Sequence, residues 1–155
     1  MSLDPTHQPE PGSKTRLRLW LRLLKVSGQV EAELRRRLRA EHDTTLPRFD
    51  VMAALARHPQ GLKMSELSSY LRVSNGNVTG IVDRLTEDGL ALRVAVKGDR
   101  RAQMARLTPK GQQAFADLAK HHETWIDNLL GALSPAEADT VLAVLGKLSE
   151  PEGKT

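Results

Sequence analysis

The chain has 155 residues, 39% of them hydrophobic and 27% charged, a composition typical of a globular protein with one core of ordinary size. It contains no cysteine, which excludes disulfides and thiolate metal sites, and it has no apolar run long enough to cross a membrane. The net charge of +4 is unevenly distributed, because residues 14–39 and 60–110 are basic whereas residues 111–155 are acidic. Most charge runs are solvated helix faces, but this distribution favours a polyanionic partner.

The first half of the chain is predicted to be helical after a short leader. Residues 1–13 contain three prolines and are expected to be disordered, and the lack of an apolar signal segment there predicts a cytoplasmic protein. Apolar residues recur at helical spacing over 14–39, which predicts one long helix. A second helix is expected to begin near Pro47 and to end before His58, and a third to span 64–71.

A short hairpin is predicted to follow the fourth helix. Ser74 is a suitable N-cap for that helix, which should run through Asp88, and Gly89 stands where a helix-ending left-handed residue belongs. Two runs with strand character follow, at 91–96 and 102–107, joined by a loop at 97–101.

Two further helices are predicted after the hairpin. Thr108 and Ser134 are each followed by proline, and this pairing is typical of helix starts. The helices should extend to about Leu133 and Leu148. The predicted fold class is therefore mainly α, with a small β-hairpin as a wing.

The fourth helix has an exposed face suited to DNA. Val78, Ile81, Val82 and Leu85 share one face and should enter the core. The opposite side of its first half is small and uncharged, and Asn and Thr side chains can read adenine and thymine edges. The candidate DNA contacts from this helix are Ser74, Asn75, Gly76, Asn77, Thr79, Gly80 and Arg84.

Two features of this face have more than one interpretation. Gly76 and Gly80 each cost about 1 kcal/mol relative to Ala inside a helix. Bare backbone would admit a DNA groove, but crowding against another helix or simple tolerance explains the glycines equally well. Asp83 opposes phosphate binding unless an arginine neutralises it, and Arg84 and Arg93 are the candidates.

The hairpin loop is basic at its tip. A short basic ribbon beside a helix that fits the major groove favours insertion into a minor groove, whereas an isolated basic turn is usually just solvated. The candidate contacts here are Lys97, Asp99, Arg100 and Arg101.

Three segments together resemble the MarR (multiple antibiotic resistance regulator) family. They are TTLPRFDVMAAL at 44–55, MSELSSYLRVSNGNVTGIVDRLTEDGLALR at 64–93 and GDRRAQMARLTPKG at 98–111. The resemblance implies a winged helix-turn-helix transcription regulator, in which Arg101 reaches the minor groove and Asp99 holds it. The sequence departs from the family pattern at Val94-Ala95, where many members carry Arg-Pro, and at Lys63, where a Ser or Thr cap is common.

The resemblance also implies a domain organisation and an oligomeric state. The dimerisation helices would be 14–45 and 109–150, the DNA-binding module 46–108, and residues 151–155 a tail. The first helix and the last two are three long apolar helices, more than one small DNA-reading module can cover, so a homodimer on a pseudo-palindromic operator is expected. Such a protein is expected to be a repressor.

Members of this family often bind small aromatic or phenolic acids. The residues predicted to line such an effector pocket are Trp20, His42, Arg48, Met52 and Trp125. Each of them fits an ordinary core or surface position equally well.

Rival functions have weaker support in the sequence. An enzyme is not expected, because there is no Cys nucleophile, HExxH motif or phosphate-binding loop. No cofactor and no metal are expected: His121 and His122 point about 100° apart on a helix, and His122 lies on an apolar stripe. The alternative that stays open is a winged-helix module that contacts another protein without sequence-specific DNA binding.

Overall fold

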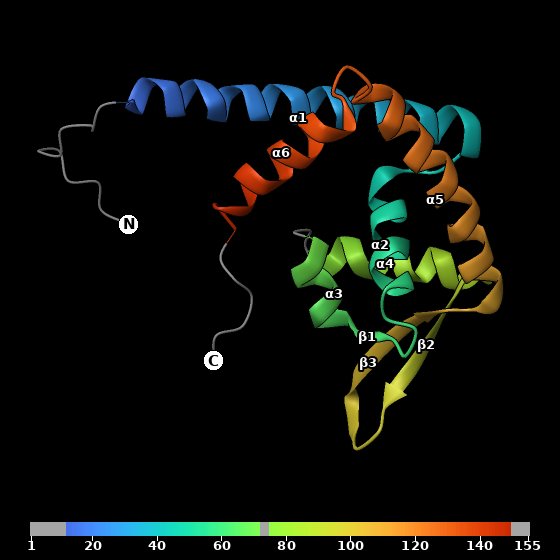
Figure 1. Ribbon diagram of the computed structural model, residues 1–155. Helices are drawn as coiled ribbons and strands as arrows, with labels where there is room; N and C mark the ends of the chain where they lie inside the picture. The colour runs from blue at the N-terminus through green and yellow to red at the C-terminus, as the bar shows by residue number, and fades with distance from the viewer. Residues whose placement is uncertain (1–11, 72–74, 150–155) are drawn as a thin grey trace, which may run out of the picture. The chain divides into compact units, whose positions relative to one another are not determined.

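The structure is a computed structural model that describes residues 12–71 and 75–149; for Asn75, Gly76 and Arg100 it describes the backbone only. The chain divides between Phe49 and Asp50 into two compact units. The elements drawn in Figure 1 are α1 (Ser13–His42), α2 (Leu46–Ala56), β1 (Leu62–Lys63), α3 (Met64–Leu71), α4 (Asn75–Glu87), β2 (Ala91–Val96), β3 (Asp99–Leu107), α5 (Pro109–Leu129) and α6 (Pro135–Gly146).

The first unit consists of α1 and the start of α2. The helix predicted over 14–39 is confirmed and extends to His42, where Asp43 ends it in a left-handed conformation with φ 48°. Leu34 and Leu38 are its buried residues, both in the C-terminal half. The N-terminal half instead exposes a group of large apolar side chains: Leu17, Leu19, Trp20, Leu21, Leu24 and Val26.

The core of the second unit is built from one face each of α2, α3 and α4 and the inner side of the sheet, and α5 packs against it. As predicted, α4 buries Val78, Val82 and Leu85 completely, while Ile81 is partly buried against the same cluster. The cluster also contains Val51, Met52, Leu55, Leu62, Leu67, Ala91, Ala105 and Leu107. This core fixes α4 with its opposite side directed to solvent.

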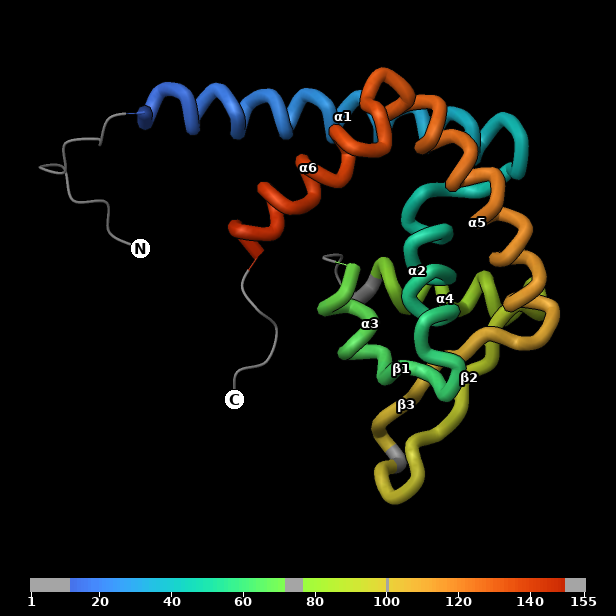
Figure 2. Tube along the Cα trace, viewed as in Figure 1, coloured from blue at the N-terminus to red at the C-terminus, as the bar shows by residue number. Residues whose placement is uncertain are grey.

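The sheet is three-stranded and antiparallel in the order β1-β3-β2. β1 was not predicted from the sequence; its two residues, Leu62 and Lys63, pair with Ala105 and Met104 of β3. The predicted loop at 97–101 is wrong: the chain turns at Lys97 and Gly98, and β3 begins at Asp99 rather than at 102. Gly98 allows the tight turn because its φ is 87°. The hairpin projects beyond α3 and α4 (Figure 2).

The last two helices begin at the predicted caps. Ser134 accepts the N–H of Glu137, whose carboxylate accepts the N–H of Ser134 in return, both at 3.1 Å. This reciprocal pair is a capping box. Both helices end earlier than predicted, α5 at Leu129 because Leu130 leaves helical geometry, and α6 at Gly146.

A compact joint connects the end of α4 to the start of α5. Gly89 has a φ of 75°, and the next residue, Leu90, donates its N–H to the carbonyl of Leu85 at 2.9 Å, which terminates α4 as predicted. The Thr108 hydroxyl donates to the Gly89 carbonyl at 2.7 Å and accepts the N–H of Gly111 at 3.0 Å. The Thr108 side chain thus caps α5 and holds it against the end of α4, which places the wing beside α4.

Candidate nucleic-acid interface

The exposed side of α4 is small and uncharged in its first half, as predicted. Asn77, Thr79 and Gly80 are exposed, because the helix turns Val78 and Val82 into the core between them. A β-carbon built on Gly80 would meet no other atom of the described residues within 4 Å, so crowding among those residues does not explain that glycine. Of the other residues predicted here, Ser74 lies outside the described residues, while Asn75 and Gly76 belong to the first turn of α4.

The second half of this face carries opposite charges that are paired. Asp83 Oδ1 lies 2.7 Å from Arg93 Nη2, so Arg93 is the arginine that neutralises Asp83. Arg93 Nη1 also donates to Gln103 Oε1 on β3 at 2.9 Å. Arg84 is exposed on α4.

Arg93 and Gln103 were not among the predicted site residues. Arg93 pairs with Ala105 and Ala95 pairs with Gln103 in the sheet, so Arg93 and Gln103 are diagonal neighbours on one face of the hairpin. In the sequence, Arg93 was a candidate only as one of two arginines that could neutralise Asp83, and nothing pointed to Gln103.

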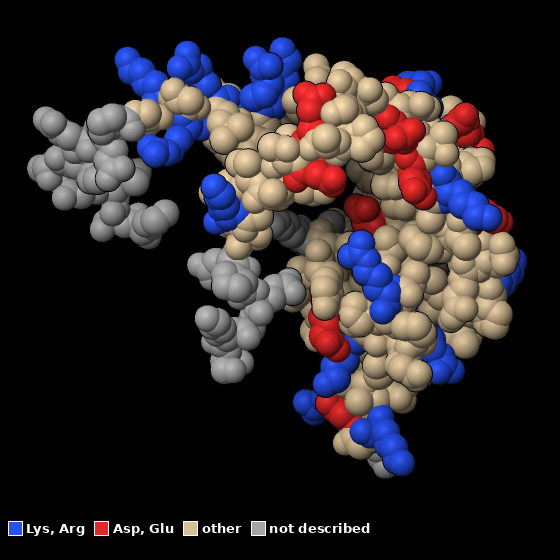
Figure 3. Space-filling view, viewed as in Figure 1, with Lys and Arg blue, Asp and Glu red and all other residues tan. Residues whose placement is uncertain are grey.

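The tip of the wing presents cationic side chains to solvent. Lys97, Asp99 and Arg101 are exposed, and Figure 3 shows Lys and Arg side chains gathered at the end of the hairpin, at the lower edge of the view. The register of β2 and β3 shifts between Ala95 and Val96, so that β3 bulges between Asp99 and Gln103. A bulge increases the local twist and redirects side chains at the end of a ribbon.

Asp99 holds Arg101 through the main chain. Its carboxylate Oδ1 accepts the backbone N–H of Arg101 at 3.0 Å. A carboxylate that bonds the backbone two residues ahead stabilises a turn. The family resemblance implied that Asp99 holds Arg101. The contact in the structure is to the Arg101 main chain, so Asp99 fixes the direction of the strand from which the guanidinium extends.

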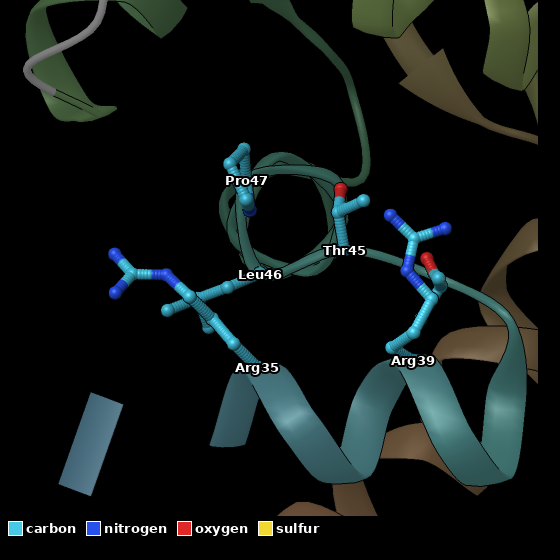
Figure 4. Close-up of a pocket in the computed structure, with 6 residues that line it drawn as sticks. Arg35, Arg39, Thr45, Leu46 and Pro47 are labelled. Carbon is cyan, nitrogen blue, oxygen red and sulfur yellow. The ribbon is translucent and has the colours of Figure 1, made fainter. Parts of the chain in front are cut away.

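Two small hollows lie elsewhere in the chain. The first, in the unit that contains α1, has a volume of about 150 Å³ and is lined by Arg35 and Arg39 of α1 and by residues 44–47 (Figure 4). The second, of about 280 Å³, lies beside α2 and α3 and includes Tyr70, whose ring contacts His58 at 5.5 Å between centroids. The residues predicted to line an effector pocket line neither of these two hollows.

Those five residues lie in different surroundings. Trp20 is exposed, and His42 and Arg48 are half-buried in the first unit. Met52 and Trp125 are buried in the second unit. The effector pocket therefore stays a prediction.

Histidine and carboxylate groups do not gather into a metal site in the described part of the chain, where no cluster of three such ligands occurs. His122 is half-buried on α5, and this burial lowers its pKa, while the carboxylate of Asp50 acts in the opposite direction. Within residues 12–71 and 75–149, none of the helices has the length and apolar character needed to span a membrane.

Comparison with known proteins identifies relatives of this chain. A sequence profile of the MarR family matches residues 42–102. The HTH-type transcriptional regulator YkoM of Bacillus subtilis is 32% identical over 108 residues, which cover 69% of each chain. The solved structure of a MarR family transcriptional regulator from Silicibacter pomeroyi is 35% identical, with a TM-score of 0.74, and the match covers 90% of this chain and 96% of that one.

Two other solved structures share the fold at lower identity. One is Sco3205, a MarR family transcriptional regulator of Streptomyces coelicolor in complex with DNA, at 20% identity, a TM-score of 0.74 and 95% coverage of both chains. The other concerns the regulation of DNA binding of Bordetella bronchiseptica BpsR by 6-hydroxynicotinic acid, at 22% identity and a TM-score of 0.73, covering 86% of this chain and 99% of that one.

Proposed function

This chain belongs to the MarR family of transcription regulators, and from that premise we propose that it represses transcription as a homodimer bound to a pseudo-palindromic operator. The observation that carries the proposal is the combination of exposed, uncharged residues in the first half of α4 (Asn77, Thr79 and Gly80) with a basic wing tip beside them. The first suits the base edges of a major groove, and the second suits the phosphates and width of a minor groove.

Within this proposal the two elements have separate tasks. Asn77 and Thr79 extend from α4 toward base edges, and Gly80 allows the backbone to come close to them. Lys97 and Arg101 add charge at the wing. Ser74, Asn75, Gly76, Arg84 and Arg100 stay predicted contacts. Two such surfaces related by a two-fold axis would read half-sites about one helical turn, roughly 10 bp, apart.

The apolar side chains at both ends of the chain support a homodimer. No residue of α6 is buried, and Val141, Leu142 and Val144 are exposed on it. The first half of α1 exposes a comparable apolar set. Exposed apolar patches of this kind mark interaction surfaces. The cationic first half of α1, visible at the upper left of Figure 3, and the acidic residues 111–155 are also complementary in charge.

The proposal also includes a small aromatic acid as the effector that regulates DNA binding. BpsR, which shares the fold, is regulated by 6-hydroxynicotinic acid, an aromatic carboxylic acid. The predicted pocket residues Trp20, His42, Arg48, Met52 and Trp125 include aromatic rings and the cation of Arg48, which suit such a ligand. A thermal-shift screen with aromatic carboxylates tests this point, since a ligand that binds the folded state raises the melting temperature.

The decisive experiment for the function is a salt titration of DNA affinity on matched and scrambled duplexes, with the operator first selected from random sequence. We expect tight, salt-dependent binding of the selected duplex and binding of the scrambled one weaker by about 10³-fold or more. Asn77→Ala should cost about 1–3 kcal/mol on the selected site and relax its sequence preference. Equal and weak binding of both duplexes would favour the alternative function, protein–protein contact through the winged helix.

A further inference from the structure

Arg93 connects the proposed recognition helix to the wing. Its Nη2 lies 2.7 Å from Asp83 Oδ1 on α4, and its Nη1 donates to Gln103 Oε1 on β3 at 2.9 Å. Nη2 also lies 3.5 Å from the carbonyl of Thr79, one turn earlier on α4. We propose that Arg93 is a positioning residue for DNA recognition, which masks the charge of Asp83 and fixes α4 and the wing at one mutual orientation. This inference rests on the proposed DNA-binding function.

The charge of Asp83 is the first reason why this contact matters. Asp83 follows Thr79 by four residues and Gly80 by three, so it lies on the same exposed side of α4 as the residues proposed to approach DNA. Its side chain is 52% exposed. An unpaired carboxylate at this place would repel phosphates, whereas an ion-paired one adds little net charge.

The geometry of the guanidinium is the second reason. A guanidinium is planar and presents its donors in a rigid fork, so two acceptors on different elements fix its plane. The acceptors here belong to Asp83 of α4 and Gln103 of β3, while Arg93 itself belongs to β2. A lysine at this position could neutralise Asp83, but it has no rigid fork that would hold Gln103 at the same time.

Fold stability alone explains this arrangement poorly. The Arg93 side chain is 27% exposed, and its Nε is buried without an acceptor among the described residues. A buried donor without a partner is unfavourable, and a partly exposed ion pair stabilises a fold only slightly. A role in orienting the DNA-binding elements accounts for a cation at this place.

A double-mutant cycle separates positioning from direct DNA contact. The variants are Arg93→Gln, Asp83→Asn and the combination of both, each measured on the selected and the scrambled duplex. We expect Arg93→Gln to weaken binding of the selected duplex about tenfold or more and of the scrambled duplex much less, because the misplaced wing and the unmasked Asp83 disturb the specific complex. Asp83→Asn alone should change affinity less than about threefold.

The double variant is expected to recover a large part of the loss, because it removes the carboxylate that Arg93 masks. Arg93→Lys should lie between wild type and Arg93→Gln, since it keeps the charge and loses the fork. Arg106→Gln serves as the control for charge: Arg106 pairs with Leu92, so it lies on the opposite face of the hairpin from Arg93. It removes one cation and should leave the ratio of the two affinities unchanged.

Other results would overturn the inference. If Asp83→Asn alone strengthened binding and the effect of the double variant equalled the sum of the two single effects, Arg93 would contact DNA itself. A loss of affinity that parallels a lowered unfolding midpoint in urea, with an unchanged affinity ratio, would show a merely structural role. If wild type bound neither duplex, the proposed function would fail and this inference with it; wild-type specificity with an inert Arg93→Gln variant would refute the inference alone.

Discussion

Gly111 packs directly against the main chain of Leu90, so that a β-carbon on residue 111 would overlap the Leu90 carbonyl oxygen. That oxygen accepts the N–H of Thr108 at 3.0 Å, and Thr108 in turn caps α5 through the N–H of Gly111. The contact closes the joint between α4 and α5. Only glycine fits at position 111 without overlap, because any β-carbon there would meet the Leu90 carbonyl.

We expect Gly111→Ala to destabilise the fold, because its β-carbon would clash with the main chain of Leu90. The backbone of Leu90 cannot move away without breaking the end of α4, so we expect a loss of about 1–3 kcal/mol, as is usual for overpacking. Urea unfolding measures it. Gly146→Ala is the control, because a β-carbon there meets no atom within 4 Å. An equally stable Gly111→Ala protein would contradict the close contact.

Gly80 offers a test in which stability and function move in opposite directions. Gly80→Ala should stabilise α4 by up to about 1 kcal/mol, because alanine is the better helix former and the position is open. If DNA comes close to this backbone, the same methyl group should weaken operator binding about tenfold or more, equivalent to about 1.4 kcal/mol. The measurements are urea unfolding and fluorescence anisotropy with the labelled operator.

Gly28→Ala is the matched control for Gly80→Ala. Gly28 lies inside α1, and a β-carbon there would also meet no atom within 4 Å. It should give a similar gain in stability with unchanged DNA affinity. Unchanged affinity in both variants would mean that Gly80 is only tolerated and that no groove approaches it.

Substitutions at the wing tip should lower the affinity for DNA without lowering the stability of the fold. Arg101→Ala should weaken binding to nearly all duplexes and lower the slope of log affinity against log salt by about 0.9 per subunit, since one phosphate contact is lost. Asp99→Ala should produce part of this loss of affinity although the positive charge of Arg101 is kept, because it removes the acceptor that holds the Arg101 main chain. The unfolding midpoint should change little in both variants, as both side chains are exposed. Wild-type binding by Arg101→Ala would leave the wing as a solvated turn.

The exposed face of α6 predicts that dimerisation can be broken without unfolding the protomer. Leu142 is 68% exposed in the single chain, so Leu142→Asp removes no contact from the protomer core. We expect it to shift a dimer toward monomer in light scattering and to abolish operator binding. Thr140→Asp, about 160° around the helix, is the control for added charge. A dimer that survives Leu142→Asp would place the interface elsewhere.

His122 predicts a dependence of stability on pH. Burial lowers its pKa from the usual value of 6.5, so the unfolded chain binds a proton at a pH where the folded chain does not. The free energy of unfolding should therefore fall as the pH drops below about 6.5 and level off below the folded pKa. His122→Gln should therefore make the urea midpoint vary less with pH between 7.5 and 5 than it does in the wild type. An identical slope in His122→Gln would refute this origin.

Features that depend on neighbouring residues could be predicted from the sequence. The order and type of the helices follow from the 3.6-residue apolar period, and the starts of α5 and α6 follow from Thr108-Pro109 and Ser134-Pro135. The core face of α4, with Val78 and Val82 inward, follows from the same period. These signals are local, so they need no knowledge of the rest of the chain.

Features that join distant residues depend on the folded chain and could not be predicted from the sequence. β1 exists because its two residues pair with β3, about forty positions away, and two residues carry no recognisable strand pattern of their own. The start of β3 at Asp99 depends on the turn at Gly98 and on the bulge, which set the register. The partner of Asp83 was undecided between Arg84 and Arg93 in the sequence, because the choice depends on how the hairpin twists against α4; folding brings Arg93 to it, with Gln103 as the second acceptor.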